Sequence, residues 1–248
     1  MSIKRCCSVA VIVLMAFFSR CGGAFAAFDA QSHIVENGLL YALDAEGEWT
    51  EVKGAGRVNE EDIQGEKIYW LAVDPEAEEI YKGWQGGIYF FDDEGEFISL
   101  VEKENAHQTW VEFSPDGEQF ILSSGTYVDR EYLLYDFDGF KFKKTFYGIG
   151  LEWLDPVRFV FTLIDVQKGA RYGGADFPGW LSVVVCDSGV DSLTTVVEAT
   201  KTEDFMMKEV DGNTGEIIIT KFSVNDEKDW KDEDAGKIKT EEIRVPVP

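Results

Sequence analysis

Hydrophobic and polar positions alternate along most of the chain in short runs that end at turn-forming residues. Residues 110–125 read WVEFSPDGEQFILSSG, in which Ser114 to Gly117 separate two runs rich in aromatic and β-branched residues. Proline fixes φ near the value that the first central turn position needs, and Asp-Gly tolerates the left-handed geometry that follows. Two such runs around a turn predict a β-hairpin.

The same pattern recurs along the chain at intervals of about 40 to 50 residues, the length of one repeat in several β architectures. In the copy that precedes it, Trp70 aligns with Trp110 and Ile80 with Phe120, so a hairpin with Pro75 in its turn is expected. The copies are WLAVDPEAEEIY (70–81), LEWLDPVRFVF (151–161) and the weaker FMMKEVDGNTGEIII (205–219).

A second predicted hairpin follows each of the first three copies, and a further one stands near the start of the chain. Two hairpins per repeat predict the four-stranded antiparallel blades of a β-propeller. About 17 strands then allow four blades plus a hairpin, or five blades of which one is incomplete. Another all-β sandwich or barrel with the same turns is the alternative fold. The additional hairpins are IYFFDDEGEF (88–97), YLLYDFDGF (132–140), LSVVVCDSG (181–189) and LLYALDAEGEW (39–49).

Closure of such a ring would require the two ends of the chain to meet. The strand-like segment KIKTEEIRVPV (237–247) could pair with the two strands expected before residue 55. This pairing would remove an exposed sheet edge that invites aggregation.

Two of these turns resemble the TolB-like β-propeller repeat, which carries a Ser-Pro-Asp-Gly turn and then an Asp-x-Asp-Gly hairpin. FSPDG (113–117) and YDFDG (135–139) match this pattern closely, and the other repeats over roughly residues 38–245 match it in part. The resemblance implies a propeller in the bacterial periplasm that makes protein–protein contacts in the cell envelope. It transfers no specific partner and no partner-binding residue, because propellers host unrelated functions.

The first 26 residues have the pattern of a cleaved secretory signal peptide. A basic start is followed by the apolar run VAVIVLMAFF (9–18) and by Ala24-Phe25-Ala26, and the run is too short to cross a bilayer. We expect residues 27–248 to form a single β-propeller-like domain without a membrane span, located in the periplasm or secreted. Cys21 raises the alternative of a lipid anchor, against which Arg20 counts. Cleavage would leave Cys186 as the one cysteine, which excludes an intramolecular disulfide.

The charge of the chain argues against nucleic acid as a partner. The net charge of −24 becomes −27 once the signal peptide, with its three basic residues and no acid, is removed. Such an excess repels phosphate backbones and anionic lipid surfaces.

Signals for catalysis and for metal binding are weak. His33 and His107 are the two histidines, and they lie too far apart in sequence for the usual zinc spacing. Hydrolase, protease and nucleotide-binding motifs are absent from the sequence, and the acidic runs fit no calcium-loop template. We therefore assign no catalytic residue, no metal ligand and no cofactor.

The connections between the second and third strands of each repeat point to a binding surface. If Pro-Asp-Gly and Asp-Gly turns lie on one face, the longer connections emerge on the opposite face, where a scaffold presents variable loops. These are 82–87, 123–131, 165–180 and 223–236. Aromatic residues and arginine are enriched among interface anchors. The candidate binding residues are Trp84, Tyr127, Arg130, Arg171, Tyr172, Asp176 and Trp180.

These observations favour an exported, monomeric, non-catalytic binding or scaffold module that presents its loops to a protein of the cell envelope. A first alternative is a hydrolytic, carbohydrate-active enzyme, which requires carboxylates with raised pKa values converging in the propeller channel. A second is a cation-stabilised structural protein, which requires that a chelator lower the melting temperature.

Overall fold

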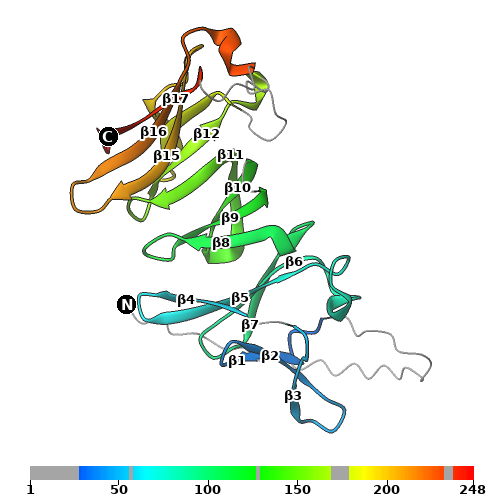
Figure 1. Cartoon of the computed structure of the whole chain (residues 1–248). Coiled ribbons are helices and arrows are strands. Elements are labelled where there is room, and N and C mark those ends of the chain that lie inside the picture. Colours follow the sequence, from blue (N-terminus) through cyan, green and yellow to red (C-terminus); the bar gives the residue numbers. More distant parts are fainter. Residues whose placement is uncertain (1–27, 56–57, 127–128, 169–178, 232–236) are drawn as a thin grey trace.

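The computed structural model describes residues 28–55, 58–126, 129–168, 179–231 and 237–248, and it shows an all-β protein. Within these ranges the chain forms seventeen strands in four antiparallel sheets that are stacked along the molecule (Figure 1). The expected signal peptide, residues 1–26, lies outside the described residues. Among those residues no helix is long and apolar enough to cross a membrane.

Strand order within each sheet follows the chain, so every connection within a sheet joins neighbouring strands. The first sheet contains β1 (His33–Glu36), β2 (Leu39–Leu43) and β3 (Trp49–Glu51), and the second contains β4 (Asn59–Ile63), β5 (Glu66–Val73), β6 (Gly87–Phe91) and β7 (Phe97–Glu102). The third contains β8 (Thr109–Phe113), β9 (Gln119–Thr126), β10 (Asp129–Asp136), β11 (Lys141–Trp153), β12 (Arg158–Ile164), β13 (Leu181–Asp187) and β14 (Ser192–Val197). The fourth contains β15 (Glu203–Asp211), β16 (Glu216–Ser223) and β17 (Lys239–Pro246). Short 3-10 turns are η1 (Glu79–Tyr81), η2 (Ala106–Gln108), η3 (Asp138–Phe140), η4 (Val166–Lys168) and η5 (Glu227–Lys231).

The sheets stack because the second sheet is apolar on both faces, and each face is covered by a neighbouring sheet. Successive side chains of a strand point to opposite faces. On β5, Tyr69 and Leu71 therefore join a core shared with the first sheet, whereas Ile68 and Trp70 join a core shared with the third. All five residues of β6 are buried. A sheet that is apolar on both faces is stable only when other sheets cover it.

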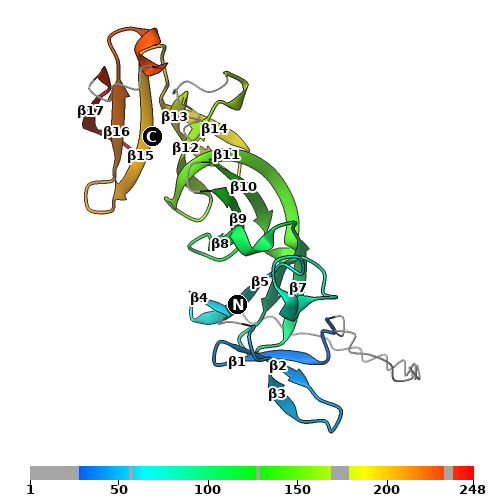
Figure 2. The same cartoon turned by 45° about the vertical axis from the view of Figure 1, so that its right-hand side comes forward.

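The third sheet is continuous because one long strand belongs to both of its halves. The first part of β11 pairs with β10, and the part from Gly148 onward pairs with β12. The register shifts at Gly150, which has a left-handed φ of 58°. Bulges of this kind bend a strand and increase its twist. The sheet consequently curls around a core that includes Phe146, Phe159 and Phe161 (Figure 2).

Most of the predicted hairpins are present in the structure. The segments 39–49, 88–97, 132–140, 151–161, 181–189 and 205–219 all form antiparallel pairs, as does the Ser-Pro-Asp-Gly hairpin that joins β8 to β9. Uniform four-stranded blades are not observed among the described residues, since the sheets contain three, four, seven and three strands. The region before residue 55 holds three strands rather than the expected two.

The hairpin predicted around Pro75 is wrong. Ile80 lies in η1, and β5 pairs with β6 across the whole intervening segment. Asp74 accepts hydrogen bonds from the backbone N–H groups of Glu76 and Ala77, and its carbonyl accepts one from the N–H of Glu78. Asp followed by Pro is a typical start of a helical turn. Without the glycine found at position 117, this segment coils instead of reversing into a strand.

The sheets do not close into a ring. Among the described strands β17 pairs with β16 alone, and β1 pairs with β2 alone. The first and fourth sheets lie at opposite ends of the stack in both views (Figures 1 and 2). The expected pairing of residues 237–247 with the N-terminal strands is therefore not observed.

Candidate functional site

Hairpin turns from several strand pairs meet on one side of the molecule, which we call the turn face. The Ser188 hydroxyl lies 2.7 Å from the Gln119 side-chain carbonyl and 2.9 Å from the Val157 backbone carbonyl. These contacts link the β13–β14, β8–β9 and β11–β12 turns. The Gln64 amide, in the β4–β5 turn, reaches the Asp116 carbonyl at 3.5 Å. The β8–β9 and β15–β16 turns lie on the left in Figure 1.

Longer connections gather on the opposite side, which we call the loop face. Lys103, in the β7–β8 connection, forms an ion pair of 2.7 Å with Glu131 at the start of β10. The Trp230 indole N–H of η5 donates a hydrogen bond of 2.8 Å to the Lys201 carbonyl. The predicted connections at 82–87, 165–180 and 223–236 belong to this face in their described parts. The long connection predicted at 123–131 is wrong, because β9 continues to Thr126 and pairs directly with β10 from Asp129. The described connections of the loop face are 74–86, 103–108, 165–168, 179–180, 198–202 and 224–231.

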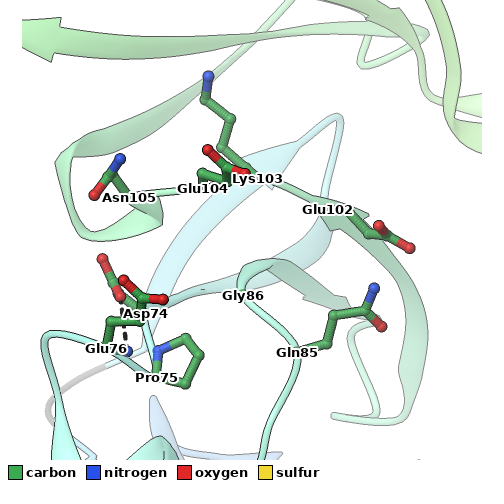
Figure 3. Close-up of a pocket in the computed structure, with 9 residues that line it drawn as sticks. All are labelled: Asp74, Pro75, Glu76, Gln85, Gly86, Glu102, Lys103, Glu104 and Asn105. Carbon is green, nitrogen blue, oxygen red and sulfur yellow. Dashed lines mark hydrogen bonds between the residues drawn. The ribbon is translucent and has the colours of Figure 1, made fainter.

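One cavity on the loop face, the first hollow, has a volume of 580 Å³ and lies between the β5–β6 and β7–β8 connections (Figure 3). Its shape depends on the coiled segment that begins at Asp74, because Asp74, Pro75 and Glu76 form one of its walls. Asp74 is 5% exposed, and its carboxylate is held by the backbone N–H groups of the turn. The lining residues are Asp74, Pro75, Glu76, Gln85, Gly86, Glu102, Lys103, Glu104 and Asn105.

Carboxylates dominate the electrostatics of the first hollow. Four of the lining residues are acidic and one, Lys103, is basic. The Lys103 and Glu131 side chains are 18% and 31% exposed, so their ion pair is partly shielded from water. The described residues contain no cluster of three His, Cys, Asp or Glu side chains arranged to hold a metal ion. The excess of carboxylates makes the hollow suited to a positively charged or hydrogen-bonding group.

A second cavity on the loop face, the second hollow, has a volume of 310 Å³ and lies beside the ends of β12 and β13. The Lys168 ammonium lies 4.8 Å from the centroid of the Trp180 ring and 3.1 Å from Oδ2 of Asp165. An aromatic face and a carboxylate both attract a cation. The lining residues are Leu163, Ile164, Asp165, Gln167, Lys168, Trp180, Ser182, Val184, Thr195 and Glu198.

Three of the seven predicted binding residues lie in the described part of the chain. Trp180 lines the second hollow and is partly exposed. Arg130, on β10, donates a hydrogen bond of 3.1 Å to the Ser123 carbonyl, and its Nε is buried without a hydrogen-bond partner. The other four, Tyr127, Arg171, Tyr172 and Asp176, lie outside the described residues.

Trp84 is placed in the core rather than on the surface. Its side chain is 9% exposed and packs against Phe28 at 4.8 Å and against His33 at 4.9 Å between ring centroids. Tyr81 and Tyr89 complete the cluster. The contribution of Trp84 in this structure is to the packing of the first two sheets, and its indole is not presented to a partner.

Sequence reasoning missed the charged residues that shape the two hollows. Lys103 and Glu131 are 28 positions apart in the chain and meet through the stacking of two sheets. Lys168 lies in a loop that was singled out for its aromatic residues and arginine instead. Its spacing of three residues from Asp165 is an available signal, because residues at i and i+3 face each other in a helical turn.

One buried carboxyl group bears on the hydrolase alternative. Burial raises the pKa of Glu112, on β8, to about 7, and the nearby Arg130 guanidinium opposes this shift. The other resolved shifts among described Asp and Glu residues, such as that of Asp155, are downward. A hydrolytic pair requires two converging carboxyl groups with different pKa values. The charged group that affects the pKa of Glu112 is the Arg130 guanidinium rather than a second carboxyl group.

Cys186 lies at the base of a hollow between β11 and β13 and is 1% exposed. Burial raises the pKa of its thiol to about 11, whereas reactive cysteines have lowered pKa values. Its environment is that of a small buried hydrophobic residue.

Comparison with known proteins identifies structural similarity without a family assignment. No family model and no curated protein matches the chain. The tricorn protease aligns with 78% of this chain and 18% of its own, at 9% identity and a TM-score of 0.46. Hydrazine synthase from Kuenenia stuttgartiensis aligns with 90% of this chain and 62% of its own, at 14% identity and a TM-score of 0.41. A putative TolB from Agrobacterium tumefaciens aligns with 86% of this chain and 77% of its own, at 14% identity and a TM-score of 0.37.

The chain thus spans about a fifth of the tricorn protease and less than two thirds of the hydrazine synthase chain. At these identities and TM-scores the similarities determine neither an activity nor a partner. The function must be argued from the site itself.

Proposed function

We propose that this protein is an exported, non-catalytic binding module that presents its loop face to a protein of the cell envelope. The observation that carries the proposal is the segregation of connections, with tight turns on one face and the two hollows on the other. A rigid scaffold with variable loops at one end is a common arrangement for recognition. The signal-peptide pattern of residues 1–26 and the turns at 113–117 and 135–139 that resemble the TolB-like repeat motivate the periplasmic location.

The loop face carries two hollows lined by charged and polar residues, which is typical of a surface that binds proteins. The first hollow joins four carboxylates to the partly shielded Lys103–Glu131 pair. Charged groups across an interface chiefly determine the rate and specificity of association. Arg171, Tyr172 and Asp176, in the same β12–β13 connection as Trp180, remain part of the proposed surface.

Crosslinking in the native cells tests the proposal. A C-terminally tagged chain is crosslinked, purified and analysed by mass spectrometry, so that the linked positions are mapped onto the two faces. We expect a reproducible envelope partner with crosslinks at residues 74–86, 103–108 or 165–180. Crosslinks that map to the turn face, or no partner above background, would contradict the proposal.

A further inference from the structure

The second hollow already holds one ammonium group, and that group belongs to the chain itself. Lys168 lies over the Trp180 ring at 4.8 Å and beside Asp165 at 3.1 Å. The ring face supplies the negative part of its quadrupole and the carboxylate supplies a full charge. Together they form a site for a cation on a flexible stem, which is the chemistry of a lysine side chain.

The walls of this site are held in place by the ends of two strands. The Asp165 N–H, just after β12, donates a hydrogen bond of 3.3 Å to the Trp180 carbonyl. Trp180 has a left-handed φ of 53°, which is unusual for a bulky residue and is tolerated where surrounding structure imposes it. The next residue, Leu181, donates its N–H to the buried Asp204 carboxylate at 3.1 Å. A preorganised site loses little conformational entropy when it binds.

The ammonium of Lys168 is held weakly enough to be replaced. Its side chain is 45% exposed, and Asp165 is 37% exposed. Ion pairs at such exposure contribute between zero and about 1 kcal/mol. The hollow has a volume of 310 Å³ and includes a second carboxylate, Glu198, near its rim. A lysine from outside can therefore enter while Lys168 moves to solvent.

We propose that the second hollow binds a lysine side chain of the protein partner, which replaces the Lys168 ammonium between Trp180 and Asp165. This inference rests on the proposed function, and it adds that the partner segment is basic. The charge of the whole chain, −24, attracts such a segment at long range. Trp180 and Asp165 then select an ammonium within that segment.

Binding of defined peptides to the purified protein, measured by isothermal titration calorimetry, tests the inference. The probe is a peptide with three lysines separated by glycines, and its counterpart carries glutamine in place of each lysine. Lys168→Gln removes the internal competitor. Lys228→Gln is the matched control, because it removes the same charge from a 79%-exposed lysine of the same face.

We expect the lysine peptide to bind and the glutamine peptide not to bind. We also expect Lys168→Gln to bind the lysine peptide about threefold more tightly than Lys228→Gln, which corresponds to a cation–π contact at an exposed site. Trp180→Ala should weaken binding by about the same factor relative to Trp49→Ala, a control at another exposed tryptophan. Circular dichroism checks that each variant is folded.

Equal affinities of Lys168→Gln and Lys228→Gln, together with no effect of Trp180→Ala, would overturn the inference. Equal binding of the free diamine cadaverine and the lysine peptide would overturn the assignment to a protein segment. If these results arise while crosslinks still map to the loop face, the inference fails and the proposed function stands. Crosslinks confined to the turn face would instead contradict the proposed function.

Discussion

The hydroxyl of Ser188 lies 2.7 Å from the side-chain carbonyl of Gln119, although the two residues are 69 positions apart in the chain. Both side chains are buried, at 6% and 8% exposure, and each stands at a hairpin turn of the third sheet. The contact joins the two halves of the curled sheet on the turn face. The contact therefore helps to fix how the strands of the two halves are oriented, and with them the connections at the opposite ends of these strands.

Loss of this contact should destabilise the fold measurably. Ser188→Ala leaves the Gln119 carbonyl without its hydroxyl donor in a buried position, and such a loss costs about 1 to 3 kcal/mol. The free energy of unfolding, measured by urea denaturation, is expected to fall by that amount. Ser192→Ala, at an exposed position of β14, should change it by less than about 0.5 kcal/mol. Equal effects of the two substitutions would mean that the hydrogen bond contributes nothing.

The turn face also depends on close contact between the second and third sheets at Gly117. A methyl group there would overlap the Ile63 side chain, and the residue has a left-handed φ of 71°. Gly47 has a similar φ of 86° with no atom near the position of an added methyl. Both substitutions to alanine incur the backbone cost of about 1 to 2 kcal/mol. Gly117→Ala should lower the melting temperature clearly more than Gly47→Ala, and an equal loss would argue against tight packing here.

Glu112 should give the fold a distinctive dependence on pH. Burial raises its pKa to about 7 from the ordinary value of 4.5, so the folded state binds a proton more tightly than the unfolded state between these values. The contribution of Glu112 to stability is therefore fully present below pH 4.5 and is lost as the pH rises toward 7.

Removal of the titrating group tests this dependence. Glu112→Gln should stabilise the protein relative to the native chain more at pH 8, above the raised pKa, than at pH 5, close to the ordinary pKa. Urea denaturation at both pH values measures the difference. Glu118→Gln, at an exposed position of the adjacent turn, is the control and should show little change. A constant offset between Glu112→Gln and the native chain at all pH values would contradict the assignment.

Addition or removal of divalent cations should leave the melting temperature unchanged. The described residues contain no cluster of three side chains suited to a metal ion, and the described part of the acidic segment, η5, is held by the buried Trp230. Thermal unfolding in excess chelator and in millimolar calcium provides the measurement. A clear fall in chelator or a rise in calcium would restore the cation-stabilised alternative.

The local pattern of the sequence predicted the hairpins well, because each depends on a few residues. Gly117 and Gly139 supply the permitted left-handed φ that a tight reversal needs, and Asp116 also accepts a hydrogen bond from the Glu118 N–H. Asp74-Pro75 lacks the glycine and starts a helical turn instead. The difference is visible in the sequence once the helix-start preference of Asp-Pro is weighed.

Long-range relationships could not be predicted in the same way. The Lys103–Glu131 pair depends on how two sheets stack, and the shared strand β11 depends on a bend at Gly150. Trp84 illustrates the same limit, since a loop tryptophan is compatible with either surface or core. Its burial depends on Phe28 and His33 from a distant segment. The alternation of strand direction allowed a prediction of which connections share a face. The hollows on that face could not be predicted, because they depend on how the sheets pack.

A pair of photocrosslinking positions tests the central claim most directly. Benzoylphenylalanine replaces Glu104, exposed at the rim of the first hollow, or Glu94, exposed in the β6–β7 turn on the other face. Both variants should fold, because neither side chain is buried. After irradiation in cells, we expect a discrete crosslinked protein from position 104 and none from position 94. Crosslinks of equal strength from both positions, or from position 94 alone, would contradict a loop face that binds a partner.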